Sequence, residues 1–291
     1  MRCNQIMKKF KENAMRAVFL LCACISVLAV IMICRFIFIN GVPAIKEIGF
    51  KNFIFGTVWK PKQELFGIFP MIVASIYVTA GAIVVGVPIG VLTAVFMACY
   101  CPKKLYRIIK PMINLLASVP SIVYGFFCLV VIVPLVQRLT NYYSSGKGIL
   151  TASILLGIMI LPTIINTSEA ALRAVHSSYF EGSLALGATK EHCIFKTVIP
   201  AAKSGIMSGI ILGVGRAIGE TMAVVMIAGN QAVLPDSITS GVRTLTGNIV
   251  LEMGYAAGLH REALIATAVV LFVFILIINV CFSLVSRKGE D

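Results

Sequence analysis

The chain has 291 residues, of which 59% are hydrophobic and 13% charged, and its formal net charge is +13. Apolar stretches of roughly 20 residues recur along it, which excludes an ordinary soluble domain and predicts a membrane protein. Because Lys and Arg gather on the cytoplasmic side of membrane proteins, the excess positive charge indicates orientation in a membrane. It is poor evidence for an anionic substrate, and we expect no nucleic-acid partner.

Six apolar segments predict six transmembrane helices and an all-α membrane protein. Backbone groups in lipid must be satisfied within each segment, which favours helices, and the runs lack the alternation of barrel strands. At about 1.5 Å per residue, even the shortest nearly crosses a hydrocarbon core of about 30 Å. The predicted spans are Ala17–Ile39, Met71–Phe96, Ile113–Val136, Ile149–Asn166, Ile206–Ala228 and Ala263–Val285.

The distribution of Lys and Arg predicts the topology. Fifteen of these residues lie on the side that holds both termini, and eight lie on the other. The positive-inside rule therefore predicts that both termini are cytoplasmic. The first span is interpreted as uncleaved, because no small-x-small cleavage pattern stands out after it. The expected parts are a cytoplasmic segment (1–16), a first transmembrane helix (17–39), an outer loop (40–70), a five-helix core (71–285) containing a cytoplasmic loop (178–202), and a cytoplasmic tail (286–291).

The sequences of the two longest outer loops do not decide the role of Trp59 or the path of the second loop. The first, Asn40–Pro70, contains Trp59, the only tryptophan. Trp59 is interpreted either as an interfacial anchor, the commoner role of membrane tryptophans, or as part of a docking surface for an outside partner. The second loop, Gly229–Glu262, is rich in Gly and Thr, and its sequence does not decide whether part of it re-enters the membrane.

None of the nine cysteines lies in an outer loop, so we expect no structural disulfide. The pairs Cys22-x-Cys24 and Cys99-x-Cys101 lack the spacing and the second half of a zinc site. We expect no metal site, and the cysteines are interpreted as small apolar residues.

The fifth predicted span contains Arg216 and Glu220, and Glu220 is the only acidic residue within any predicted span. Each charge costs about 2.5–3.5 kcal/mol at a helix centre, so such residues usually face the bundle interior or a water-filled cavity. Their i, i+4 spacing places them on one face, where they can pair. The functional hypothesis is that Arg216, Glu220 and the adjacent Thr221 line a solute path, with Arg216 attracting an oxyanion and Glu220 holding or releasing it. The alternative is a pair that only locks this span to a neighbour.

The cytoplasmic loop Ser178–Ala202 has the sequence pattern of a short helix, a turn and a second helix. Ser178 and Glu181 fit a capping box, in which the serine caps the helix and the glutamate reaches back. Gly187 is expected to end the first helix, because glycine tolerates a left-handed cap.

The second helix of this loop is expected to begin after Thr189 and to run to about Val198, with Pro200 preceding the fifth span. Several apolar side chains accompany the polar ones. They suit either the membrane surface or the groove of a partner protein, and the residues alone favour neither. These side chains are Tyr179, Phe180, Leu184 and Leu186.

The spacing of Glu181, Gly187 and Pro200 resembles the EAA loop of ABC importer permeases. The sequence departs from the usual motif at Gly182, Ser183 and Thr197, although the spacing is kept. The literal string Glu169-Ala170-Ala171 does not fit, because Val175 stands where the motif has glycine.

Further blocks resemble the PstC-type permeases of phosphate importers and cover almost the whole chain. Each block is modestly specific, but their order along the chain makes the resemblance strong. The blocks are ASVPSIVYGFF (Ala117–Phe127), MILPTIINTSEAALRAV (Met159–Val175), LALGATK (Leu184–Lys190), GRAIGETMAVVMIAGN (Gly215–Asn230), NIVLEM (Asn248–Met253), and the Trp59-x-Pro61 and Phe66-Gly67 pattern.

This resemblance implies the type I ABC importer permease architecture in a bacterial inner membrane, with a cytoplasmic coupling-helix loop. It implies four kinds of partner: a sister permease of the PstA type, an ATPase dimer of the PstB type, an extracytoplasmic phosphate-binding protein of the PstS type, and membrane lipid. The loop residues expected to engage the ATPase are Tyr179, Glu181, Leu184, Gly187, Ala188, Thr189 and Pro200.

The chain contains no G-x-x-x-x-G-K-[ST] nucleotide-binding loop, so we do not expect it to be an enzyme. No cofactor is expected in this chain, and ATP and Mg are expected to bind the partner ATPase. Three alternatives remain: an ABC permease for another oxyanion, a secondary transporter driven by protons through Glu220, and a membrane component that senses phosphate without transporting it. The lack of an internal inverted repeat argues against the second.

Overall fold

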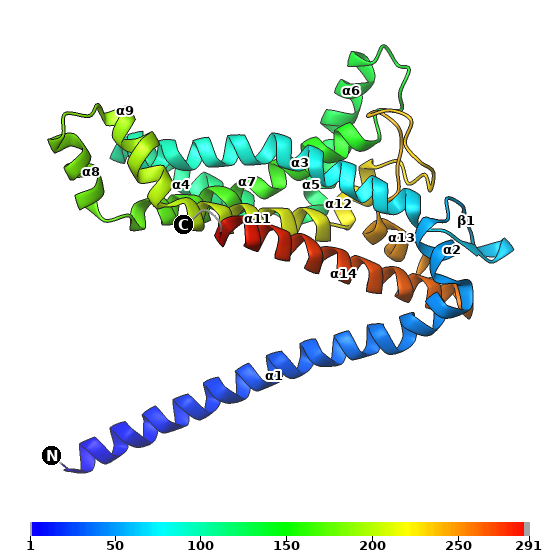
Figure 1. Ribbon diagram of the computed structural model, residues 1–291, viewed down its shortest axis with the longest axis horizontal. Coiled ribbons are helices and arrows are strands. Elements are labelled where there is room, and N and C mark those ends of the chain that lie inside the picture. Colours follow the sequence, from blue (N-terminus) through cyan, green and yellow to red (C-terminus); the bar gives the residue numbers. More distant parts are fainter. Residues whose placement is uncertain (1, 288–291) are drawn as a thin grey trace.

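The computed structural model describes residues 2–287, and these are almost entirely helical (Figure 1). Five helical segments of this described part are long and apolar enough to cross a membrane. A sixth span results when the helices on either side of a 67° bend are counted as one. The prediction of an all-α protein with six spans is therefore confirmed. The five segments are Met15–Ile48, Phe69–Tyr100, Ser121–Leu139, Ile149–Ala174 and Leu259–Cys281, and the bent pair is Lys190–Ala201 with Lys203–Gly219.

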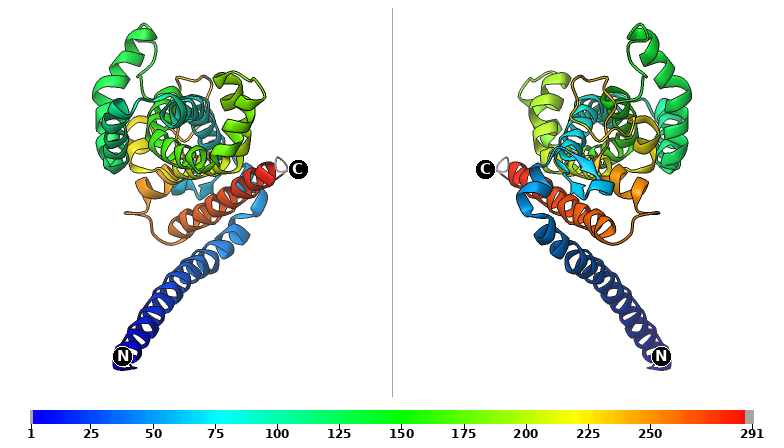
Figure 2. Two further views of the ribbon diagram at one scale, coloured as in Figure 1. Left: turned by 90° about the vertical axis from the view of Figure 1, so that its left-hand side faces the viewer. Right: turned by 90° about the vertical axis from the view of Figure 1, so that its right-hand side faces the viewer.

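Helix α1 (Arg2–Ile48) diverges from the rest of the protein, as both figures of the whole chain show (Figures 1 and 2). Its most apolar stretch is not buried by any other described element. Only its C-terminal part packs, against α14 (Leu259–Arg287), where Phe38 and Phe272 meet edge to face. Short elements follow at this end of the molecule. They are α2 (Phe50–Phe55), β1 (Trp59–Lys60), the 3-10 turn η1 (Pro61–Gln63) and β2 (Leu65–Phe66), with the two strands antiparallel.

The core is formed by α3 (Phe69–Val95), α7 (Ile149–Ala174) and α11 (Lys203–Gly219), which pack along much of their lengths. Glycines allow the close approach of α3 to α7. A Cβ atom at Gly86 would lie only 2.7 Å from the Ile160 side chain. Because membrane helices gain little from hydrophobic burial against one another, such close contacts between small residues and neighbouring side chains are a main source of their packing.

The helices between α3 and α7 are interrupted by irregular turns. The predicted span at Ile113–Val136 is wrong at its start, because Val119 is extended before Pro120 and a new helix begins at Ser121. The clash of a proline ring with the preceding residue disfavours helix at that position. The elements are π-helical η2 (Phe96–Tyr100), α4 (Lys103–Ser118), α5 (Ser121–Phe127), π-helical η3 (Cys128–Ile132) and α6 (Val133–Leu139).

Each π-helical turn of the described chain ends two residues before a proline, namely Pro102, Pro134 and Pro200. Proline has no N–H group, and its ring clashes with the carbonyl four residues earlier. A π-helical turn shifts the hydrogen-bond register. At Pro134 and Pro200 the helical segment continues past the proline, whereas at Pro102 it ends and Cys101 is extended.

The remaining helices lie toward the two ends of the molecule, except α12, which packs against α5 within the core. Figure 1 shows α8 and α9 at the end opposite the β1–β2 hairpin, so the predicted cytoplasmic and outer loops lie at opposite ends. The elements are α8 (Ser177–Ala185), α9 (Lys190–Cys193), π-helical η4 (Ile194–Val198), α10 (Ile199–Ala201), α12 (Met222–Ile227) and α13 (Leu245–Glu252).

Candidate functional site

The fifth span is not one continuous helix. Helix α11 ends at Gly219, Glu220 is extended, and α12 begins at Met222. The continuous span predicted at Ile206–Ala228 is therefore wrong at this point. Broken helices at membrane depth normally occur where they are buried in protein or line a cavity, because their free backbone groups need partners.

Arg216 lies about 20 Å along the helix axis from the start of α11, so its charge is deep within the span. The side chain is half-buried, and its Nη1 donates to Thr163 Oγ1 at 3.4 Å. A guanidinium has five N–H donors. In the described part of the chain this is its one hydrogen bond, so most of its donor capacity is available to an anion.

Glu220 does not pair with Arg216 among the described ion pairs, so the pairing inferred from the i, i+4 spacing is wrong. Its carboxylate instead accepts from the Ala223 N–H at 3.3 Å, at the start of α12. The physical reason is the break itself: an extended Glu220 no longer projects along the helical face that carries Arg216. Thr221 follows within the break, and its hydroxyl donates to the Gly219 carbonyl at 3.2 Å.

A polar niche of about 10 Å³ borders the break at Glu220. That volume holds one water molecule at most. An oxyanion does not fit in the niche in this arrangement of the helices. Four hydroxyl side chains line the niche: Ser75, Thr79, Thr244 and Thr246.

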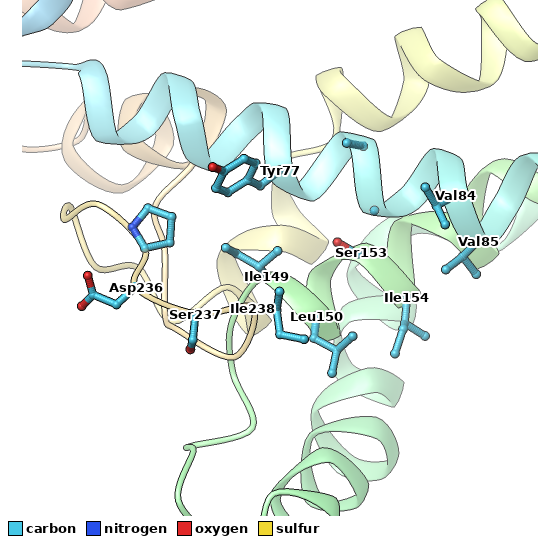
Figure 3. A pocket seen from close by; sticks show the side chains of 13 residues that line it. Tyr77, Val84, Val85, Ile149, Leu150, Ser153, Ile154, Asp236, Ser237 and Ile238 are labelled. Atoms are coloured by element: carbon cyan, nitrogen blue, oxygen red, sulfur yellow. The ribbon is translucent and has the colours of Figure 1, made fainter.

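A larger cavity, about 600 Å³, lies elsewhere, between α3, α7 and the loop 235–238 (Figure 3). Its wall includes Val84, Val85, Leu150 and Ile154, and Figure 3 shows Asp236 on the loop at one end. These aliphatic side chains donate no hydrogen bonds, and the side-chain hydroxyls in the lining are those of Tyr77, Ser153 and Ser237. We therefore assign the candidate solute path to the break in the fifth span and not to this cavity.

Glu169, in α7, is the centre of a buried polar network that the sequence did not predict. Its side chain is 2% exposed and forms ion pairs with Lys110 at 2.6 Å and Arg173 at 2.7 Å. Tyr106 donates its hydroxyl to the same carboxylate at 2.7 Å, and this bond raises the pKa of Tyr106 above its ordinary value. Because α7 continues to Ala174, Glu220 is not the only acidic residue within a span, which corrects the prediction.

Arg173 also connects this network to the end of α3. Its Nη2 donates to the Met97 carbonyl at 2.9 Å. The Cys101 N–H bonds the Phe96 carbonyl across η2, and Pro102 has no N–H, so the Met97 carbonyl lacks its usual helical partner. Arg173 supplies the missing donor and joins α7 to η2 at the same end of the molecule as α8.

The predicted coupling loop folds as two helical segments, with one correction. Helix α8 begins one residue before Ser178, and its N-cap is His176, whose Nδ1 accepts from the Ser178 N–H at 3.3 Å. The capping box predicted between Ser178 and Glu181 is therefore wrong. Gly187 ends α8 in a left-handed conformation, φ 84°, and Thr189 caps α9 by accepting from the His192 N–H at 3.3 Å, as predicted.

Several apolar side chains of this loop are exposed, beside exposed polar ones. Leu186 is 91% exposed, and Tyr179 and Leu184 are also exposed. Glu181 and Pro200 are exposed, whereas Ala188 is half-buried. The second segment runs on through η4 to Ala201, beyond its predicted end near Val198. Exposed apolar side chains that protrude together mark an interaction surface.

Glu252 is the centre of a second buried network, at the outer end. Its carboxylate accepts from Trp59 Nε1 at 2.8 Å and contacts His260 Nε2 at 2.8 Å, and it forms an ion pair with Arg243. Trp59 is 8% exposed, so within this chain it is neither an interfacial anchor nor part of a docking surface, the two interpretations considered from the sequence. Arg173 lies four residues after Glu169 and is a local partner. The other partners of Glu169, Tyr106 and Lys110, and the Trp59 partner of Glu252 come from distant segments, so no local pattern indicates them.

Comparisons with known proteins agree with this architecture. Residues 86–289 match the family model described as "Binding-protein-dependent transport system inner membrane component". The probable ABC transporter permease protein YqgH of Bacillus subtilis is 36% identical over 284 residues, covering 94% of this chain and 91% of the relative. The phosphate transport system permease protein PstC of Pasteurella multocida is 34% identical over 239 residues, covering 76% and 75%.

Two solved structures share the fold. The inward-facing MetNI methionine ABC transporter aligns with a TM-score of 0.59 at 21% identity, covering 80% of this chain and 99% of that chain. A bacterial alginate ABC transporter, solved with a periplasmic protein bound to an alginate pentasaccharide, aligns with a TM-score of 0.60 at 14% identity, covering 86% and 87%. At these identities the likeness concerns the fold alone.

Proposed function

Because this chain belongs to the family of binding-protein-dependent transport system inner membrane components, and is thus a permease of the ABC importer class, we propose that its solute is inorganic phosphate. One observation of this chain carries the proposal. Arg216 is half-buried in a broken span, and its guanidinium donates one long hydrogen bond to the protein, to Thr163. A guanidinium with unused donors suits the oxygens of phosphate, which it binds in bidentate geometry. Relatives named as phosphate transport permeases support the same choice of solute.

The proposed assembly contains a sister permease, two ATPase subunits and an extracytoplasmic phosphate-binding protein. In this arrangement both termini of the chain are cytoplasmic, α8 and α9 contact the ATPase, and the β1–β2 hairpin faces the binding protein. The chain itself holds no cofactor, and ATP and Mg bind the partner ATPase. Closure of the ATPase pair moves α8 and α9, and the helices around Glu220 separate so that phosphate passes Arg216.

The direct test is uptake of labelled phosphate under phosphate limitation, in cells from which the gene has been deleted and then restored. Deletion is expected to abolish the uptake and restoration to recover it, with excess sulfate failing to compete. Competition by sulfate would identify another oxyanion as the solute. Unchanged uptake in deleted cells that have no second phosphate system would contradict the proposal.

Replacing Leu186 with serine is expected to weaken the contact with the ATPase. Leu186 is 91% exposed in this chain, and burying a leucine in a partner groove contributes about 2 kcal/mol, more than tenfold in affinity. The measurement is the amount of ATPase that co-purifies with the permease at limiting concentration. Tyr143→Ser is the matched control, since Tyr143 is 94% exposed on the α6–α7 loop, at the other end. Equal co-purification of the two variants would remove Leu186 from the interface.

A further inference from the structure

Helix α13 connects two sites that are distant in sequence. It is a short helix of eight residues, Leu245–Glu252, within the outer loop, and it packs against α14, α3 and α12 (Figure 1). Its length is about 12 Å. One end reaches the break in the fifth span, and the other belongs to the buried network around Glu252.

The first end of α13 is bonded to the break. Thr246 donates its hydroxyl to the Glu220 carbonyl at 3.2 Å, and the Leu245 N–H donates to Ser75 Oγ at 3.0 Å. The Glu220 carbonyl has no helical partner, because α11 has already ended. Thr246 is 7% exposed, so water does not readily replace its hydroxyl. The position of α13 therefore helps to determine the conformation at Glu220.

The second end of α13 is bonded to the outer face. Glu252 holds Trp59 from the β1–β2 hairpin, Arg243 from the preceding loop and His260 from α14. A surface cavity of about 340 Å³ opens onto Glu252 and His260 beside the exposed Tyr255. A protein that docks on the hairpin therefore lies next to the side chains that position this end of α13.

Asn248, in the middle of α13, has one paired and one unpaired polar group within the described part of the chain. Arg243 Nη1 donates both to Glu252 and to the Asn248 Oδ1 atom at 3.1 Å, which fixes the helix to the loop before it. The Asn248 Nδ2 group is fully buried and has no partner among the described residues. Buried donors are normally paired, so Asn248 Nδ2 is an unmet hydrogen bond in this arrangement of α13.

We propose that α13 is a rigid connector that transmits docking of the binding protein on the outer face to the break at Glu220, with Glu252 and Thr246 as positioning residues. The proposal rests on the importer function described above. It requires that a change at Glu252 alters the backbone around Glu220, although the two residues do not touch.

The first test uses the assembled importer in lipid nanodiscs without substrate. Hydrogen exchange is compared for wild type, Glu252→Gln and the control Glu64→Gln, which removes an exposed charge from the hairpin. Glu252→Gln is expected to speed exchange of the amides of residues 219–224 roughly two- to tenfold, the effect of weakening one hydrogen bond. Faster exchange confined to residues 243–262, or no change beyond that of the control, would overturn the proposal.

The second test acts at the other end of α13 and uses ATP hydrolysis. Thr246→Val removes the hydroxyl and keeps the shape, whereas Thr246→Ser keeps the hydroxyl. The quantity measured is the rate of ATP hydrolysis with the loaded binding protein present, divided by the rate without it. This ratio is expected to fall roughly two- to tenfold in the valine variant and to recover in the serine variant. A ratio unchanged by valine, or one that serine fails to restore, would contradict the proposal.

The stimulating protein is chosen on the wild-type importer, by comparing loaded phosphate-binding and sulfate-binding proteins. Stimulation by the sulfate-binding protein alone would contradict phosphate as the solute, and the Thr246 comparison would then use that protein. The hydrogen-exchange test needs no solute. A negative result there counts against the connector role of α13 alone, and stimulation by the sulfate-binding protein alone counts against phosphate as the solute.

Discussion

Replacing Arg216 with alanine is expected to lower phosphate uptake roughly a hundredfold, because two charge-assisted hydrogen bonds to phosphate contribute about 3 kcal/mol. The side chain is deep in α11 and has one hydrogen bond to the protein, so its removal takes little from the fold. The measurement is the initial rate of uptake as a function of phosphate concentration. Arg216→Lys is expected to recover part of the rate, since lysine keeps the charge but not the bidentate geometry.

The control for this prediction is Arg138→Ala, which removes an exposed arginine near the end of α6. Its uptake is expected to match that of wild type. If Arg216 only locks the span to α7 through Thr163, alanine would lower the melting temperature of the complex as well as uptake. Wild-type uptake by Arg216→Ala would exclude Arg216 from the solute path.

Replacing Glu169 with alanine is expected to destabilise the permease by about 3 kcal/mol, the low end of the range for removing one partner of a buried ion pair. The carboxylate is 2% exposed, whereas the Lys110 and Arg173 side chains are 28% and 46% exposed, so water partly compensates the two cations. The measurement is thermal or denaturant unfolding of the purified complex in one detergent.

The matched control is Glu12→Ala, which removes the acidic partner of an exposed i, i+4 pair with Arg16. Exposed pairs contribute little, so its stability is expected to equal that of wild type within error. Replacing Glu169, Lys110 and Arg173 together by apolar residues is expected to recover part of the loss, because no unpaired charge then remains. Equal unfolding of the Glu169 and Glu12 variants would contradict the importance of the network.

Five of the spans could be predicted because each is long and apolar enough to be recognised alone, whereas the sixth qualifies only as a bent pair of helices. Two helix boundaries were predicted from a local signal: Gly187 adopts the left-handed conformation and Thr189 caps α9. The local signal at Ser178 and Glu181 was misleading, because His176 is the N-cap of α8. The start of the third span was missed although Pro120 carries a local signal, because the apolar run continues across that proline.

The candidate site was less predictable, because its geometry depends on contacts between distant segments. The spacing of Arg216 and Glu220 predicts a pair only if the helix continues, and its break at Glu220 is stabilised by Thr246, which lies 26 residues later. Trp59 is buried because Glu252, 193 residues away, accepts its N–H. Neither contact leaves a periodic pattern in the sequence.

The central claim is that this chain carries phosphate in an importer driven by ATP. Its most direct test is phosphate uptake into vesicles that contain the purified permease pair and ATPase, with the phosphate-binding protein outside and ATP inside. We expect uptake that requires ATP, the binding protein and Arg216, and that continues when the proton gradient is abolished. Uptake by this chain alone, driven by a proton gradient and independent of ATP, would contradict the central claim.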